Sequence, residues 1–397
     1  RGPSGWANSR RFSTTPANLA NPALLCGTSV DLVIRRLGEL ERRIAVEITD
    51  VVVDVTHPSS RDVEVVLESA HARLRHKVDN RIFRDRTVPT IVRELLAESN
   101  VFVEERLQGT YPMRPYTVQW NESTLDFVHR LLEEEGIAYV VADAPEPGSK
   151  TPRDRIFLCD GRHAYGDPRE LPFVPRSRLE RSASAVTSLR HRARMVAGKV
   201  LVRDFSTARP DLPIEGTAKI EGAGATRAEV YLYPGSVAQD AVAAQRARAV
   251  ADALSTQAAG YDGSADALSL APGQLVTVID LPLFGDETGR LELLVTEIAH
   301  EHRDRDVTGS AASLAFGAIA GAGPTFRPMR RTPKPLAPGF QEGVVCGPPG
   351  EDIHTDAMGR VKVHFPWDRH LPHDDIASDW IPVLQDNTGT SAAIRSE

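Results

Sequence analysis

The chain has 397 residues, which at roughly 100 to 200 residues per domain corresponds to about two to four domains. Its composition, 41% hydrophobic and 25% charged, is that of an ordinary globular protein, and no run approaches the roughly 18 apolar residues of a membrane-spanning helix, which excludes an integral membrane protein of that kind. The net charge of -7 argues against a nucleic-acid partner, because phosphate binding draws on clustered Lys and Arg.

Residues 1–28 are predicted to form a disordered or divergent N-terminal extension. Residues 1–22 carry Arg1, Arg10 and Arg11 among several Ser, Thr, Asn and Pro residues and no acidic residue, a composition that can mimic an organellar transit peptide. We favour a disordered extension over a targeting signal, because no amphipathic pattern is visible. We expect no signal peptide.

Four apolar and β-branched runs between Ser29 and Leu67 predict an antiparallel meander or barrel. Charged turn residues separate these runs, and such spacing of short strands is typical of antiparallel sheets. The runs are 29–34, 43–48, 51–55 and 63–67.

A helix is predicted directly after Thr87. The Thr87 hydroxyl suits an N-cap, and Pro89 lies in the first turn, where its missing N–H is tolerated. Apolar residues then repeat at helical spacing and form one stripe, which consists of Val88, Ile91, Val92, Leu95 and Leu96.

Residues 116–141 predict a strand, a helix and a second strand. Ser123 with Asp126 three residues later suits a helix start, and Gly136 suits the stop before the next strand. The three acids Glu133 to Glu135 are interpreted as a solvated helix face. A catalytic role is the alternative, but no second carboxylate is tied to them by a recognisable spacing.

The middle of the chain is predicted to contain further strands and one long helix. Strands at 139–141 and 155–159 flank a loop rich in Pro and Gly and predict a hairpin. The Ala-rich run 237–260 has almost no helix breakers and predicts a long helix. Other strands are predicted within 189–204 and at 274–280 and 291–300. Residues 325–335 are basic and rich in proline, which predicts an extended connector.

Polar and apolar residues alternate strictly in Arg360–Phe365, which predicts a half-buried strand. Val361, Val363 and Phe365 are expected to pack inside a small antiparallel barrel. Arg360, Lys362 and His364 are expected to face outward.

A short strand at 343–346 and a third at 379–384 would complete three strands of this barrel. Pro382 removes a backbone donor from the third, which favours an edge or bulged position there. Residues 340–397 carry four basic and ten acidic residues, a net charge of -6, which argues against oligonucleotide binding.

The sequence contains no recognisable catalytic or cofactor-binding motif. The glycines of 222–224 and 321–323 lack the third glycine of a dinucleotide-binding loop, and neither GxSxG nor HExxH occurs. The three cysteines, Cys26, Cys159 and Cys346, lie too far apart for a CxxC-type zinc site or a disulfide framework and are interpreted as small apolar residues in a reducing compartment.

One histidine and aspartate cluster is the best candidate for a metal site, because imidazole and carboxylate groups suit zinc. The cluster consists of His364, His370, His373, Asp368, Asp374 and Asp375. We nevertheless expect no metal there, since His364 is predicted to face outward and the other residues lie in an acidic loop. No catalytic, cofactor-binding or metal-binding residue is therefore predicted.

Read in order, these segments resemble the spike protein of type VI secretion systems, the VgrG family. The strongest resemblance is a structural motif, which comprises Gly359, Arg360, Val361, Lys362, Val363, Phe365, Trp367, Asp368, Arg369 and Trp380. The run Gly347, Pro348, Gly350, Glu351, Ile353, Thr355 and Asp356 precedes it as in that family. A second strong match lies at 116–139, and further matches lie at 81–92, 231–235 and 293–300, so that the resemblance covers roughly residues 29–397.

The resemblance implies a mainly β fold with some α (α+β), in which tube-like β-barrel hub domains with packed helices precede a small OB-fold-like barrel. Residues 29–105 and 236–325 would form a discontinuous first hub barrel and residues 106–235 a second. Residues 326–339 would be a proline-rich linker, and residues 340–397 an incomplete OB-fold-like barrel.

The same resemblance implies a structural rather than an enzymatic protein. It implies a homotrimer that sits on a tube-forming ring protein (Hcp-like), carries a tip-sharpening protein and effectors through a further C-terminal region, and touches a target membrane transiently. Such a spike assembles in the bacterial cytoplasm and is then translocated into a target cell. The alternatives are a spike with an enzymatic effector domain outside these residues, and the hub of a phage or extracellular injection system.

Overall fold

The structure, a computed structural model, describes residues 10–13, 22–36, 39–57, 60–175, 177, 184–206, 211–220, 224–235, 237–282, 286–303, 311–323, 325–351 and 354–384. Most of the predicted extension 1–28, the motif residue Ile353 and the last part of the predicted barrel, 385–397, lie outside the described residues. Within them, strands predominate and three α-helices occur, which confirms the predicted fold class of mainly β with some α.

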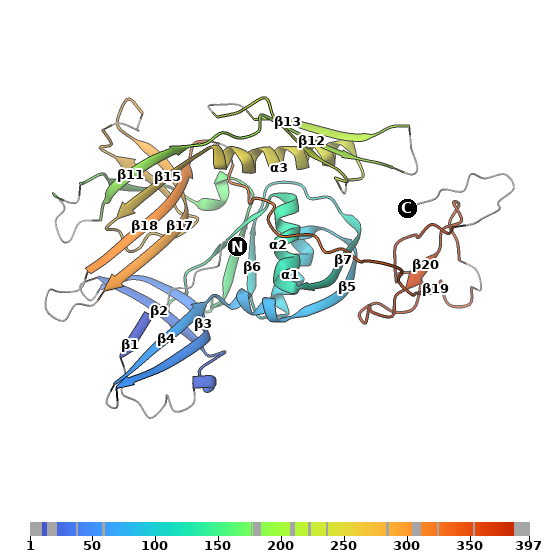
Figure 1. Ribbon diagram of the computed structural model, residues 1–397, viewed down its shortest axis with the longest axis horizontal. Coiled ribbons are helices and arrows are strands. Elements are labelled where there is room, and N and C mark those ends of the chain that lie inside the picture. The colour runs from blue at the N-terminus through green and yellow to red at the C-terminus, as the bar shows by residue number, and fades with distance from the viewer. Residues whose placement is uncertain are drawn as a thin grey trace. The chain divides into compact units, whose positions relative to one another are not determined.

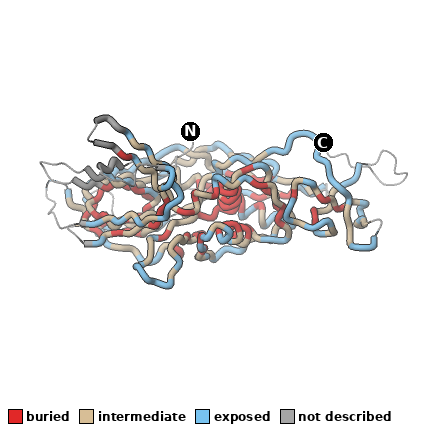
Figure 2. The backbone as a smooth tube through the Cα atoms, turned by 90° about the horizontal axis from the view of Figure 1, so that it is seen from below, coloured by how far each residue is buried: buried red, intermediate tan, exposed pale blue. Residues whose placement is uncertain are grey.

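The chain divides into two compact units, which are described separately. Unit 1 comprises residues 1–72, 96–110 and 132–331, and unit 2 comprises residues 73–95, 111–131 and 332–397. Buried residues concentrate in the helices and along the strands of both units, whereas many loops are exposed (Figure 2).

Unit 1 begins with a four-stranded antiparallel sheet in the order β1-β4-β3-β2 (Figure 1). The prediction of separate strands at 43–48 and 51–55 is wrong, because both belong to one long strand, β3 (Glu39–His57). Asp50 lies at a register shift against β4 rather than in a turn. β1 (Arg10–Ser13) pairs with β4, so these four residues of the predicted extension form a strand. The remaining strands are β2 (Ser29–Arg36) and β4 (Ser60–Glu68).

A six-stranded sheet in the order β10-β16-β17-β18-β15-β11 curls around a hydrophobic core of unit 1. A bridge between Phe173 and Val186 brings its two edges together, and the Val174 N–H donates to the Val186 carbonyl at 2.9 Å. The strands are β10 (Arg169–Pro172), β11 (Val186–Ala193), β15 (Ala259–Ala265), β16 (Leu275–Ile279), β17 (Leu291–Arg303) and β18 (Ala311–Ala320). The predicted strands in these regions are confirmed.

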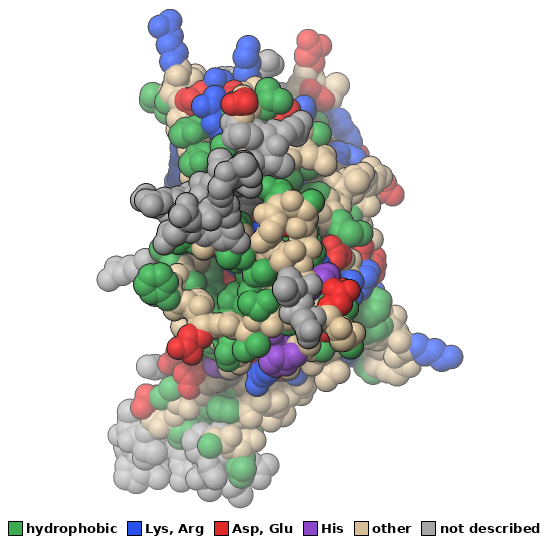
Figure 3. Space-filling view, turned by 90° about the vertical axis from the view of Figure 1, so that its right-hand side faces the viewer, with side chains coloured by type: hydrophobic (Ala, Val, Ile, Leu, Met, Phe, Trp, Pro, Cys, Tyr) green, Lys and Arg blue, Asp and Glu red, His purple; other side chains and the backbone are tan. Residues whose placement is uncertain are grey.

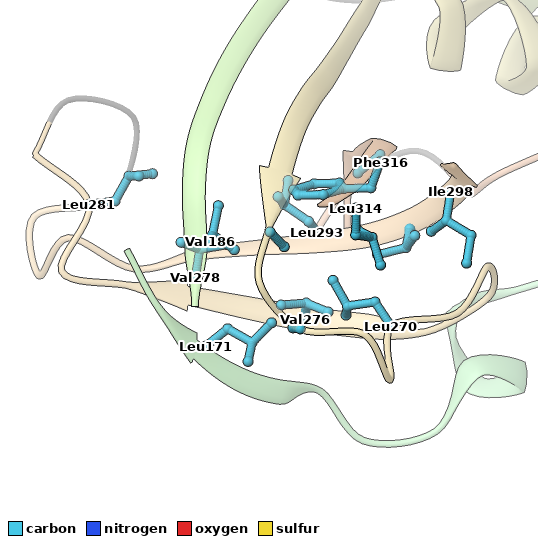
Figure 4. Close-up of a cluster of buried hydrophobic side chains, with 14 residues drawn as sticks. Leu171, Val186, Leu270, Val276, Val278, Leu281, Leu293, Ile298, Leu314 and Phe316 are labelled. Carbon is cyan, nitrogen blue, oxygen red and sulfur yellow. The ribbon is translucent and has the colours of Figure 1, made fainter. Parts of the chain in front are cut away.

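The interior of this curled sheet is apolar. Figure 4 shows side chains from several strands converging, among them Leu171, Val276, Leu293, Leu314 and Phe316. Gly263 makes room for the ring of Phe316, because a Cβ at Gly263 would overlap that ring. Each such buried side chain contributes roughly 1.5 to 3 kcal/mol relative to an exposed one.

The predicted long helix is confirmed as α3 (Asp240–Ala258), which covers one face of a three-stranded sheet. Its buried side is built from small residues at helical spacing, Ala243, Ala247 and Ala251, which pack against Val200 and Val202. The sheet has the order β13-β12-β14, with β12 (Lys199–Asp204), β13 (Ile214–Lys219) and β14 (Glu229–Leu232).

A fourth sheet of unit 1 has the order β6-β9-β8 and confirms the predicted hairpin between 139–141 and 155–159. Its strands are β6 (Phe102–Arg106), β8 (Ala138–Val141) and β9 (Arg155–Cys159). The helix before β8, α2 (Thr124–Glu135), ends at Gly136, whose φ of +68° favours glycine. Short 3-10 helices lie at Pro22–Leu24, Ala70–His76 and Arg162–Tyr165.

The interpretation of Glu133 to Glu135 as a solvated helix face is wrong. Glu134 and Glu135 are each only 7% exposed. Glu135 forms an ion pair of 3.4 Å with Arg246 of α3, and Glu133 accepts a hydrogen bond of 2.8 Å from the Arg331 N–H. Because buried carboxylates require partners, these contacts give the acidic run a structural role that the sequence did not reveal.

Unit 2 contains an antiparallel ribbon of β5 (Val78–Arg86) and β7 (Arg114–Ser123). β5 leads into α1 (Val88–Ala97), whose predicted N-cap is confirmed, because the Thr90 N–H donates to the Thr87 hydroxyl at 3.4 Å. Phe83 of the ribbon stacks on Phe127, with ring centroids 5.6 Å apart. This ribbon provides the platform on which the last segment of the chain packs.

The last segment forms a two-stranded sheet of β19 (Val344–Cys346) and β20 (Lys362–His364). The predicted third strand at 379–384 is reduced to one antiparallel bridge, in which Val361 and Ile381 exchange backbone hydrogen bonds of 2.9 and 2.8 Å. The OB-fold-like barrel therefore stays a prediction.

The division into two hub barrels and a linker also stays a prediction. The six-stranded sheet takes β10 and β11 from the predicted second barrel and β15 to β18 from the predicted first barrel. Within the described part of 326–339, no helix or strand occurs, and residues 326–331 belong to unit 1.

Candidate functional site

The predicted structural motif begins with a tight turn closed by Asp356. One oxygen of its carboxylate accepts the N–H groups of Met358 and Arg360, both at 2.9 Å, and the other accepts Arg360 Nε at 2.6 Å. Burial raises the pKa of Asp356, but the Arg360 side chain and these N–H groups outweigh it and hold the pKa below its ordinary value. Gly359 has a φ of +71°, which explains why glycine suits this turn.

The predicted orientation of β20 is wrong. Lys362 and His364 are 4% and 5% exposed, whereas Val363 is half-buried and its cross-strand partner Val345 is 61% exposed. The alternation predicted a two-faced strand correctly, but it could not tell which face would be covered. On the covered polar face, Lys362 contacts Ser378 and the ring of His364 stacks on the ring of His373.

Lys362 is buried with its charge satisfied. Its Nζ donates to the Ser378 carbonyl at 2.9 Å and lies 4.6 Å from the centroid of the Trp380 ring. Desolvation, followed by repulsion from Arg84, lowers the pKa of Lys362. The neighbouring Val363 N–H donates to the Ser378 hydroxyl at 2.9 Å, so that Ser378 binds two consecutive strand residues.

Aromatic contacts anchor the motif to the β5–β7 ribbon of unit 2. Phe365 stacks on Trp367 with ring centroids 5.1 Å apart, and Trp367 meets Trp120 of β7 edge-on at 5.0 Å. Such pairs contribute about 0.5 to 1.5 kcal/mol beyond the area that they bury. The motif therefore joins the last segment to the ribbon through three rings.

Asp79 of β5 is the polar anchor of the same junction. Its carboxylate accepts Arg369 Nη2 at 3.1 Å and contacts His370 Nε2 at 3.2 Å. Burial raises the pKa of Asp79, but the hydrogen bonds from Arg369, His370 and the Asn80 N–H outweigh it and lower the pKa. No sequence pattern singles out Asp79, because only the folded chain brings β5 next to residues 369 and 370.

Asp368 of the motif holds the turn that follows it. The side chain is 2% exposed, and Oδ1 accepts the N–H groups of His370 at 2.9 Å and Leu371 at 3.4 Å. Burial, together with the charges of Asp368 and Asp379, raises the pKa of Tyr116 on β7 to about 12. Asp368 is thus a structural acceptor.

The candidate metal cluster does not converge on one point. His364 stacks on His373 with ring centroids 3.3 Å apart, whereas Nε2 of His370 contacts the Asp79 carboxylate. Asp374 accepts the Ile376 N–H at 3.0 Å, and its carbonyl accepts the Cys346 thiol at 3.0 Å. Within the described residues, no group of three or more His, Cys, Asp or Glu side chains could hold a metal ion.

The last segment leaves large hydrophobic side chains at its surface. On the face drawn in Figure 3, hydrophobic side chains lie between charged and histidine side chains. In residues 332–384 the exposed ones are Leu336, Phe340, Val344, Val345, Met358, Ile376, Val383 and Leu384. Exposed apolar residues in such number are typical of surfaces that bind other protein segments.

Among the helices that the structure describes, none combines the length and the apolar character of a membrane span.

Comparison with known families matches most of this chain to one of them. The profile of the phage tail baseplate hub (GPD) family matches residues 12–305. The type VI secretion system spike protein VgrG1b of Pseudomonas aeruginosa is 31% identical over 317 residues, which is 77% of this chain and 42% of that protein. The actin cross-linking toxin VgrG1 of Vibrio cholerae is 28% identical over 340 residues, 82% of this chain and 30% of that protein. The chain thus spans less than half the length of these relatives.

A solved structure shows the same fold. It is a type VI secretion system component of E. coli that is described as structurally similar to the phage T4 tail proteins gp27 and gp5. It aligns with a TM-score of 0.64 at 22% identity and covers 89% of this chain and 80% of that one. The predicted resemblance to type VI spike proteins and phage tail hubs is therefore confirmed.

Proposed function

Because this chain belongs to the phage tail baseplate hub (GPD) family, we propose that it builds the base of a type VI or related contractile-injection spike. The hub match over residues 12–305, together with relatives named as spike proteins, is the observation that supports this proposal. The role is mechanical, and it requires buried contacts between subunits rather than an activated catalytic group.

We infer that the working form is a homotrimer. The exposed hydrophobic residues of the last segment support this inference, because Val344 and Val345 at 57% and 61% exposure would be covered by further chain segments in an assembly. A trimer would sit on a tube-forming ring protein (Hcp-like). The tip-sharpening protein and effectors would bind regions that the longer relatives possess in addition. Residues 340–397 would belong to an OB-fold-like collar between base and needle.

The spike would assemble in the bacterial cytoplasm and then enter a target cell, with transient contact to the target membrane. Its aromatic contacts between Phe365, Trp367 and Trp120 and its ion pair between Asp79 and Arg369 suit a part that is loaded mechanically. On this proposal the chain segment itself is not an enzyme, and its motif residues act by packing.

Light scattering coupled to size-exclusion chromatography tests the oligomeric state on the protein encoded by the complete reading frame. We expect a mass of three subunits. A strictly monomeric protein at micromolar concentration would contradict the spike assignment.

Secretion tests the role directly. Deleting the gene in the bacterium that encodes it should abolish release of the ring protein into the medium, and a plasmid copy should restore it. Unchanged release after deletion, in a strain with no second spike gene, would refute the proposal.

A second candidate is a spike that carries an enzymatic effector domain outside these residues. It is favoured by one observation, the similarity to a relative named as an actin cross-linking toxin. Reading the complete frame for a domain with a catalytic motif separates the two candidates. A hub of a phage or an extracellular injection system is a variant of the first candidate.

A further inference from the structure

The segment 325–331, predicted as part of an extended connector, packs within unit 1. The half-buried ring of Phe326 packs on two separate hydrophobic clusters. One cluster contains Ala138 of β8 and Cys159 of β9, and the other contains Leu294 of β17 and Ile319 of β18. Phe326, together with Tyr165, therefore packs across the seam between the β6-β9-β8 sheet and the six-stranded sheet.

The next residue ties the end of one helix to another. Arg327 Nη1 donates to the Gly136 carbonyl, just past the end of α2, at 2.8 Å, and Arg327 Nε lies 3.9 Å from Asp252 of α3. A cation near a helix C-terminus is favourable because of the helix dipole. A Cβ at Gly136 would lie 2.8 Å from Ala249 Cβ and 3.2 Å from Arg327 Cδ, so only glycine leaves room for this close packing.

A third contact holds the C-terminal end of the segment. The Arg331 N–H donates to Glu133 of α2 at 2.8 Å. The segment thus contacts α2, α3 and two sheets within seven residues. Desolvation raises the pKa of Asp252 although Arg327 opposes that shift, which agrees with a junction from which water is partly excluded.

We propose that residues 325–331 are a strap that passes force from the C-terminal segment into unit 1. This inference rests on the proposed spike function. Tension on the chain beyond residue 331 loads the contacts of Arg331, Arg327 and Phe326 in turn, and these distribute it over two helices and two sheets. A free linker would instead extend before any force reached the sheets.

Hydrogen exchange and limited trypsin digestion test the strap on the full-length protein. Trypsin cleaves after Arg330 and Arg331 but not after Arg327, which precedes Pro328. We expect cleavage at 330 and 331 to be at least about tenfold faster in F326A and in E133A than in the parent, because each removes one anchor and opens the segment locally. The exchange of the Arg331 amide should accelerate in E133A.

The matched control is E133Q, whose side-chain carbonyl still accepts the Arg331 N–H without the charge. It should retain slow cleavage and slow exchange, and circular dichroism should show that all variants are folded. Cleavage in the parent as fast as in F326A and E133A would overturn the docked strap.

Secretion of the ring protein then tests the force path. We expect the F326A/E133A double variant to fold and to reach the oligomeric state of the parent, yet to lose at least about tenfold in secretion, whereas E133Q secretes normally. Normal secretion by the double variant overturns the strap but leaves the spike role intact. Normal secretion after gene deletion refutes the spike role itself, so the two failures are distinguishable.

Discussion

At the scale of the residue, the motif depends on polar groups that are buried with partners. Lys362 is the clearest example, because the residue is 4% exposed and its amino group donates a hydrogen bond to the Ser378 carbonyl. A sequence pattern assigns such a lysine to solvent. A long side chain can nevertheless cover apolar surface with its methylene groups while its charge finds a carbonyl and an aromatic face.

We expect Lys362→Ala to destabilise unit 2 by about 1 to 3 kcal/mol, because the Ser378 carbonyl is left unpaired and the contact with Trp380 is lost. Urea unfolding monitored by tryptophan fluorescence measures the change. Val345→Ala on the exposed face of the paired strand is the control and should change the free energy of unfolding by less than about 0.5 kcal/mol. Equal effects of both substitutions would contradict the assigned burial.

The lowered pKa of Asp79 predicts a pH dependence. A carboxyl whose folded pKa lies below its unfolded value of about 3.9 contributes stability that is present above the unfolded pKa and is lost as pH falls through the folded pKa. We therefore expect Asp79→Asn to be about 1 kcal/mol less stable than the parent at pH 7, since solvent screens the exposed Arg369. The difference should shrink as pH falls below about 4. Denaturant titrations at pH 7, 5 and 3 measure it, and a difference that stayed constant to pH 3 would count against this anchor.

At the scale of the element, local sequence determines where helices begin and end. The start of α2 is capped by Ser123, whose Oγ accepts the Asp126 N–H at 3.0 Å and donates to the Asp126 carboxylate at 2.7 Å. The stop at Gly136 is equally local, because a positive φ favours glycine. Both were predicted, since caps depend on neighbours within four residues.

Ser123→Ala should destabilise the protein by about 1 kcal/mol, because the Asp126 N–H at the helix start loses its acceptor. Ser123→Thr keeps the hydroxyl and should remain within about 0.5 kcal/mol of the parent. Thermal or urea unfolding monitored by circular dichroism distinguishes the two. A threonine variant as unstable as the alanine variant would mean that packing rather than the cap determines the effect.

At the scale of the whole molecule, stability rests on cores assembled from distant parts of the chain. The curled sheet of unit 1 joins residues 169–193 to residues 259–320, and Phe316 lies within its core, 5% exposed. Sheets assembled from such distant segments depend on side-chain interlocking.

Phe316→Ala should destabilise unit 1 by about 3 to 5 kcal/mol, because it leaves a cavity in a well-packed core. Phe102→Ala removes the same ring at a site that is 50% exposed and should have a much smaller effect. Urea unfolding of both variants at the same protein concentration is the measurement. A loss below about 1 kcal/mol for Phe316→Ala would show that this sheet does not enclose a well-packed core.

The sequence by itself determined the three α-helices, many of the strands and the family. Helix caps and the alternation in Arg360–Phe365 are local properties, and the motif order carried the resemblance that the hub match confirmed. The tertiary structure decided which side of each element is covered. Lys362, His364 and Glu135 are buried because Ser378, His373 and Arg246 come to them from elsewhere in the chain. A single sequence does not encode those partners at any fixed spacing, and therefore orientation, anchors and the strap at 325–331 emerged only from the folded chain.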